Sequence, residues 1–120
     1  MSRDGTPEVT VDESTVPAGG TVRGRVLIHA MDSIKARGVE LEVGWRTSGR
    51  GDTDEKLVHT ERIHEQSVPP GGLDIPFSVD LPPVPCTYHG ELIKIHWFAR
   101  ARIDRALARD PRAEADFVVR

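Results

Sequence analysis

The sequence lacks the features that would place it outside the cell or within a membrane. Its 120 residues contain one cysteine, Cys86, so no internal disulfide can form. No stretch approaches the roughly 20 consecutive apolar residues that a membrane-spanning helix needs, and residues 1–9 contain no apolar segment of the kind found in secretion signals. We therefore expect a cytoplasmic protein with no membrane span.

A strong excess of charge of either sign is also missing. Sixteen basic and 19 acidic residues give a formal net charge of −3, which argues against nucleic acid as a partner. Stretches that favour helix are few, whereas 11 glycines and 9 prolines punctuate the chain. This punctuation is typical of short strands joined by turns.

Apolar and polar residues alternate along most of the chain with the period of two that marks β-strands. Turn residues separate these segments, and residues 48–54 (SGRGDTD) have the composition of a flexible loop. About seven strands predict an all-β, immunoglobulin-like antiparallel β-sandwich. We expect a flexible N-terminus at residues 1–7 and the sandwich domain at residues 8–120. The predicted strands cover residues 8–11, 21–30, 39–47, 56–66, 73–81, 93–104 and 113–119.

Two features of these strands carry further expectations. Trp45 and Trp97 lie on inward faces and are expected to meet in the core between the sheets. The strand at residues 56–66 has polar side chains on both faces, which is typical of a strand at a sheet edge. Its inward face is one of two alternating sets, either Leu57, His59, Glu61 and Ile63 or Val58, Thr60, Arg62 and His64.

Five segments follow the order and spacing of a known family pattern. They are 17–26 (PAGGTVRGRV), 39–44 (VELEVG), 75–82 (IPFSVDLP), 85–90 (PCTYHG) and 95–104 (IHWFARARID). Together they resemble the N-terminal domain of the arrestin-like family, which includes bacterial sporulation-control relatives. The resemblance implies an arrestin-like β-sandwich and a non-enzymatic role as an adaptor or scaffold that binds other proteins. Members of this family typically carry two such sandwiches in tandem, whereas this chain has one, and Cys86 stands where the pattern usually has serine.

Four arginines on two predicted strands are candidates for partner binding. Arg23 and Arg25 alternate on one strand, and Arg100 and Arg102 alternate on another. If these strands share a sheet, the arginines form one basic patch that would bind an acidic or phosphorylated segment of a protein partner. The alternative is that acidic residues on neighbouring strands neutralise them, namely Glu40, Glu42 and Glu91.

Phe98 falls on the polar face of its strand, the face that also carries Arg100. An outward Phe98 together with Leu92 would add a small apolar contact surface to the arginine patch. The alternatives are that a second layer, the first strand or a second copy of the chain covers Phe98. A second copy would join through a sheet edge and form a homodimer.

A small-ligand or metal-binding β-sandwich is the alternative function, and it rests on the histidines. His29 and His96 lie on the polar sides of their strands as potential neighbours across a sheet, but no histidine pair has a recognised ligand spacing. Cys86 and His89 form the only local pair of nucleophile and base, without a glycine-rich loop or helix N-terminus to activate the thiol. We therefore assign no catalytic residue, no metal ligand and no cofactor.

Overall fold

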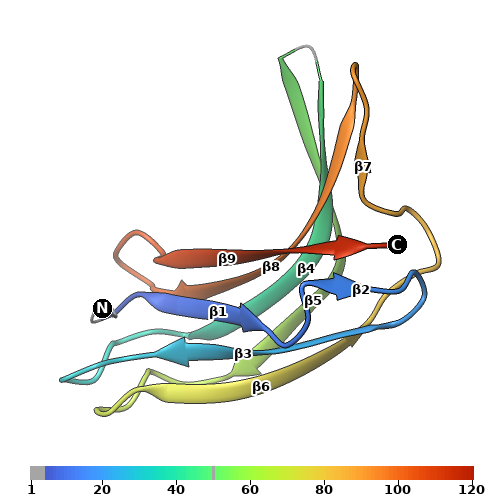
Figure 1. Ribbon diagram of the computed structural model, residues 1–120. Helices are drawn as coiled ribbons and strands as arrows, with labels where there is room; N and C mark the ends of the chain where they lie inside the picture. Colours follow the sequence, from blue (N-terminus) through green and yellow to red (C-terminus); the bar gives the residue numbers. More distant parts are fainter. Residues whose placement is uncertain (1–4, 50) are drawn as a thin grey trace.

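The computed structural model describes residues 5–49 and 51–120 (Figure 1). These residues form strands and turns, and no helix that could cross a membrane occurs among them. Seven longer strands correspond to the seven predicted ones, and two further strands have two residues each. The all-β prediction is confirmed. The strands are β1 (Pro7–Val11), β2 (Thr15–Val16), β3 (Thr21–Ile28), β4 (Gly38–Gly49), β5 (Asp52–His64), β6 (Leu73–Asp80), β7 (Tyr88–His89), β8 (Lys94–Asp104) and β9 (Arg112–Val119).

The strands pair into two sheets that pack face to face (Figure 1). The small sheet has three strands in the order β1-β3-β6, and the large sheet has six, in the order β2-β9-β8-β4-β5 with β7 pairing to β8. All neighbouring strands are antiparallel except the short β2, which runs parallel to β9. This arrangement confirms the predicted antiparallel β-sandwich.

The core lies between the two sheets, and Trp97 of β8 is its largest fully buried side chain. Trp97 packs against Phe117 with 6.0 Å between ring centroids and donates its indole N–H to the carbonyl oxygen of Pro85 (3.0 Å). Trp45 is half-buried and is the cross-strand partner of Trp97 on β4. Directly opposite residues of paired strands point to the same face, and Trp45 packs against the core cluster that contains Trp97, so the two tryptophans meet at the core as expected. They do so as neighbours within one sheet, because β4 and β8 both belong to the large sheet.

The prediction of an edge strand at residues 56–66 is confirmed, since β5 is the last strand of the large sheet. β5 begins earlier than predicted, at Asp52, because β4 and β5 continue as one hairpin with Ser48 opposite Thr53. The described residues of the loop predicted at 48–54 therefore lie mostly in these two strands.

Two bulges explain why neither alternating set of β5 faces the core as a whole. Register shifts between β4 and β5 leave Val58 and Ile63 without a cross-strand partner, and both side chains pack against the core. Val58 belongs to one predicted set and Ile63 to the other. An extra residue in one strand moves the following side chains to the opposite face, so the inward set changes along β5.

The large sheet is longer than the small sheet. The β4–β5 hairpin and the β7–β8 pair extend beyond the small sheet as an arm (Figure 1), and the longest axis of the molecule measures 46 Å. The opposite end carries the turns between β3 and β4, between β5 and β6, and between β8 and β9. Of the predicted flexible N-terminus, residues 5–7 are described: Gly5 donates its backbone N–H to the carbonyl of His29 (2.7 Å) at this end, and Pro7 opens β1.

We predict that Trp97→Ala lowers the free energy of unfolding by roughly 3–5 kcal/mol, because it leaves a cavity beside Phe117 and an unpaired carbonyl at Pro85. Leu107→Ala is the matched control: its side chain is 95% exposed, so the change should stay below about 0.5 kcal/mol. Urea unfolding followed by circular dichroism measures both values. Equally small losses in the two variants would contradict the assignment of Trp97 to the core.

Candidate functional site

The outer face of the large sheet, which turns away from the small sheet, carries a cluster of five charged side chains. Arg100 lies at its centre and is only 7% exposed. It donates hydrogen bonds to Glu42 (2.9 Å), Glu55 (3.1 Å) and Glu114 (3.0 Å). Arg46 donates to two of the same carboxylates, at 2.9 Å to Glu55 and 2.9 Å to Glu114. We call these five residues the outer ion-pair cluster.

The register between strands brings the cluster together. Glu42 of β4 and Glu114 of β9 stand opposite Arg100 on its two sides, and Glu55 of β5 stands opposite Arg46 of β4. Because side chains alternate between the faces of a strand, this register places all five on the same face. Four neighbouring strands thus each contribute charge to one network.

The two arginines keep Glu55 in its charged form. Hydrogen bonds from Arg100, and then from Arg46, lower the pKa of the Glu55 carboxyl to about 2. The bond to Glu55 is also the main cause that raises the pKa of the Arg46 guanidinium. Since two guanidinium groups face three carboxylates, the cluster has no excess positive charge to offer to a partner.

Phe98 lies beneath the outer ion-pair cluster and is fully buried. The guanidinium carbons of Arg46 and Arg100 lie 4.7 and 5.0 Å from the centre of its ring, within cation–π distance. The expectation of an outward, exposed Phe98 is therefore corrected. Charged side chains of its own sheet cover the ring, rather than a second layer, the first strand or a second copy. Leu92 is separate and stays 66% exposed in the bend that precedes β8.

The four candidate arginines do not form one patch. Arg23 and Arg25 lie exposed on β3 in the small sheet, whereas Arg100 and Arg102 lie on β8 in the large sheet. The condition that their strands share a sheet is not met. Three of the four have acidic partners, which are Asp74 for Arg25, Glu42 for Arg100 and Asp110 for Arg102.

A second ion-pair group lies at the far end of β8 from the arm. Asp104 is buried and accepts hydrogen bonds from Arg37 (2.8 Å) and Arg62 (2.9 Å), and these bonds, with that from Arg37 the stronger cause, lower the pKa of its carboxyl. Arg62 also donates to Glu40 (2.7 Å). Glu40, expected to neutralise one of the candidate arginines, thus pairs with the edge strand β5 instead.

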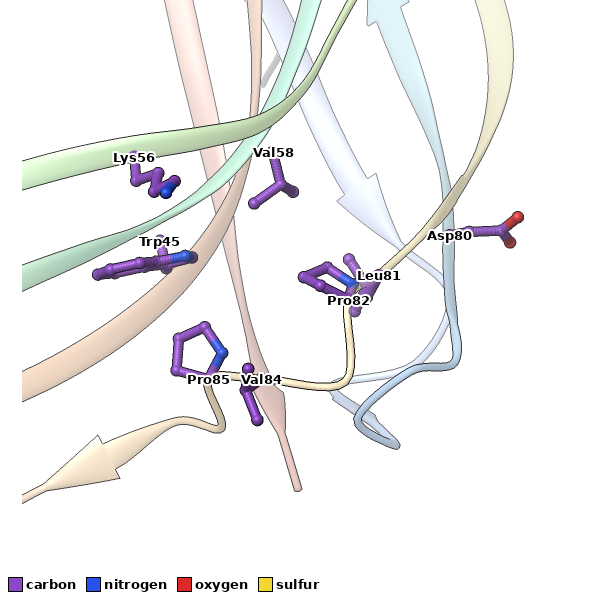
Figure 2. A pocket seen from close by; sticks show the side chains of 8 residues that line it. All are labelled: Trp45, Lys56, Val58, Asp80, Leu81, Pro82, Val84 and Pro85. Carbon is purple, nitrogen blue, oxygen red and sulfur yellow. The ribbon is translucent and has the colours of Figure 1, made fainter.

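An open cleft of about 550 Å³ lies where the arm diverges from the connection between β6 and β7 (Figure 2). The ring of Trp45 lies between Lys56 and Pro85, and Asp80 points away from them (Figure 2). Val84 is 71% exposed at this cleft. Most of the lining is apolar, and the full set is Trp45, Lys56, Val58, Asp80, Leu81, Pro82, Val84 and Pro85.

The cleft adjoins the free edge of β5, because Lys56 and Val58 belong to that strand. β5 pairs with β4 without interruption from Asp52 to Leu57, and the first bulge follows at Val58. A free edge presents unpaired N–H and C=O groups to which another strand can pair. The β6 edge of the small sheet differs, since Pro76 lacks an N–H and interrupts such pairing.

The histidines do not gather into a metal site. His29 follows β3 in the small sheet and His96 lies on β8 in the large sheet, so the predicted pair does not share a sheet. His96 instead meets His89 of β7 edge to face, with 5.1 Å between ring centroids. Among the described residues, no three His, Cys, Asp or Glu side chains are placed to hold a metal ion.

The sequence pattern did not predict the cleft. Its residues come from β4, from β5 and from residues 80–85, and only the fold brings these segments together. The signal in the sequence was the group of prolines after β6, Pro82, Pro83 and Pro85, which fixes an extended crossing that cannot pair as a central strand.

The fold matches that of a solved protein. The sporulation control protein Spo0M from Bacillus subtilis matches 95% of this chain with a TM-score of 0.76, at 16% sequence identity. The match confirms the arrestin-like β-sandwich that the sequence resemblance implied, and it concerns the fold alone. The chain spans about half of that protein's length, 48%. No protein-family model matches the chain, and no curated protein matches it in sequence.

We predict that Glu55→Gln removes part of the pH dependence of stability. The folded-state pKa of Glu55, about 2, lies below its ordinary value of 4.5. Ionised Glu55 therefore stabilises the fold above about pH 5, and this contribution is lost as the pH falls from about 5 towards 2. Urea unfolding at neutral and acidic pH should show a larger acid-induced loss for the wild type than for E55Q. Identical losses would contradict the assignment.

We also predict that Arg100→Gln lowers the free energy of unfolding by about 3 kcal/mol, because it leaves Glu42 without its partner and uncovers Phe98. Arg23→Gln is the matched control, since Arg23 is exposed and forms no ion pair with the described residues; it should change stability by less than about 0.5 kcal/mol. Denaturant titrations at neutral pH give both values. A loss at Arg100 as small as that at Arg23 would show that the cluster does not stabilise the sheet.

Proposed function

We propose that the chain is a non-enzymatic protein-interaction module of the cytoplasm, an adaptor that binds an extended segment of a partner protein along the free edge of β5. The observation that carries this proposal is a stretch of free sheet edge without a bulge, from Asp52 to Leu57, beside an apolar cleft. An added strand gains main-chain hydrogen bonds from the edge, and a neighbouring pocket accepts its side chains. The exposed free thiol of Cys86 is consistent with a reducing compartment.

The cleft supports selectivity for the bound segment. Alternate side chains of a strand point to the same face, so every second residue of the added segment would face the cleft. Trp45, Pro82 and Pro85 line it, and burying one large apolar side chain of the partner among them contributes about 1.5–3 kcal/mol. Lys56 is the cation in the lining, so an acidic residue next to the apolar one fits the site by charge.

Leu92 is the one residue of the sequence-predicted binding surface that we keep in the proposed one. Phe98 and Arg100 are occupied within the sheet and are left out of the binding surface. Leu92 is exposed on the arm with Ile93 (47%) and Tyr88 (54%), and these three extend the proposed contact surface beyond the cleft. The β5 edge is also where a second copy of the chain would pair, so the experiment must separate a homodimer from a complex with another protein.

The test is capture from a soluble extract with the tagged chain, followed by titration of the captured protein against purified variants. Val84→Asp places a charge in the apolar cleft and should weaken binding at least about tenfold, which corresponds to about 1.4 kcal/mol. Lys56→Glu should weaken it by a smaller factor that shrinks as salt is added, because an exposed charge is screened.

Arg23→Glu is the control, since it reverses an exposed charge in the other sheet and should leave the affinity within about twofold. Equal affinities of V84D and the wild type would refute the proposed site. Analytical ultracentrifugation of the chain alone addresses the homodimer: an edge dimer that V84D dissociates, with no other protein captured, would replace the adaptor by self-association.

A further inference from the structure

The end of the sandwich opposite the arm carries an exposed loop between β8 and β9, at residues 105–111 (Figure 1). Leu107 in this loop is 95% exposed, and its neighbours Ala106 and Ala108 are exposed as well. A single exposed leucine is ordinary on a protein surface and by itself indicates nothing. The charged groups beside Leu107, together with a hollow, indicate a binding surface.

A hollow of about 180 Å³ lies at Leu107, and Lys35, from the turn between β3 and β4, lines it together with Arg105. The Nε of Arg105 is buried and has no hydrogen-bond partner within residues 5–49 and 51–120. Among the described residues, neither Lys35 nor Arg105 forms an ion pair, so no described carboxylate neutralises the two cations that line the hollow. A group that fits between two such cations is an anion.

The loop is positive although the chain is negative overall. Loop residues 105–111 contain Arg105 and Arg109 against one acidic residue, Asp110, whereas the whole chain has a formal net charge of −3. Asp110 is already engaged, since it accepts hydrogen bonds from the Arg102 side chain and from the backbone N–H of Arg105 (2.9 Å). The loop therefore presents positive charge and one apolar side chain to its surroundings.

We propose that this end of the sandwich docks on an anionic phospholipid surface, where a lipid phosphate enters the hollow between Lys35 and Arg105 and Leu107 inserts at the boundary of the acyl chains. A free phosphate would use the two cations but would leave Leu107 in water. A lipid uses both, and the small side chains of Ala106 and Ala108 add no charge at the inserted tip.

Such docking is weak and reversible, because one apolar side chain and a few cations carry it. It strengthens with the share of anionic lipid and weakens with salt. The β8–β9 loop lies at the end opposite the arm, and the proposed binding stretch of β5 lies in the β4–β5 hairpin of the arm, so a docked chain keeps that stretch free (Figure 1). Membrane docking and partner binding therefore use different surfaces, and each can be tested without the other.

Vesicle flotation tests the proposal with the full chain and two lipid mixtures, phosphatidylcholine alone and phosphatidylcholine with about 30% phosphatidylserine. We expect at least about fivefold more bound chain on the anionic vesicles, and loss of that binding as salt is raised. Leu107→Ser should reduce binding at least about threefold, and Lys35→Gln combined with Arg105→Gln should reduce it to the level of the neutral vesicles.

Two matched controls remove comparable side chains elsewhere. Leu92→Ser takes an exposed leucine from the arm, and Arg23→Gln takes an exposed arginine from the small sheet; both should bind like the wild type. Thermal unfolding confirms that each variant is folded. If the double variant is not folded, Lys35→Gln alone takes its place. Absence of binding to anionic vesicles, or equal losses in the controls, would overturn the proposal. Wild-type binding by L107S would also overturn it, since the chain would then bind the vesicles by charge alone, without insertion of Leu107.

Discussion

Strand β8 is buried on both of its faces, and the rest of the structure depends on how each face is covered. On the inner face, Trp97 and Ala99 pack in the core between the sheets. On the outer face, Phe98 is covered by guanidinium groups, among them that of Arg100. A buried arginine is stable only when carboxylates satisfy it. Because β4, β5 and β9 supply these carboxylates at fixed positions, the outer ion-pair cluster favours one register of four strands over every alternative.

The same constraint orders the edge strand that we propose as the binding site. Glu55 belongs to the uninterrupted part of β5, and two arginines from within the sheet hold it in place. The edge is therefore ordered before a partner arrives, and association with an ordered edge costs less conformational entropy than association with a mobile loop. We infer that Arg46 and Arg100 position the binding edge rather than contact the partner. In this view, Arg100 is the one arginine of the predicted binding patch that contributes to binding, and it does so indirectly.

Alternation in the sequence was sufficient to predict the seven longer strands and the edge position of β5, because it reports which side chains share a face of one strand. It did not predict the burial of Phe98, since what covers a face depends on the register between strands that are distant in the chain. For the same reason, it could not tell that Arg23 and Arg100 lie in different sheets. The alternation could not predict the cleft either, because the cleft exists only where the large sheet extends past the small one. The bulge at Val58, which turns a side chain of β5 towards that cleft, left no local signal.

Backbone amide exchange along β5 measures most directly whether this edge is the binding site. The comparison is between the chain alone and its complex with the captured partner, with exchange followed residue by residue. We predict slower exchange in the complex at residues 53–57, where an added strand would form hydrogen bonds, and unchanged exchange along β6, where Pro76 interrupts the edge. Unchanged exchange along β5, with new protection confined to β6 or to the β8–β9 loop, would contradict the central claim.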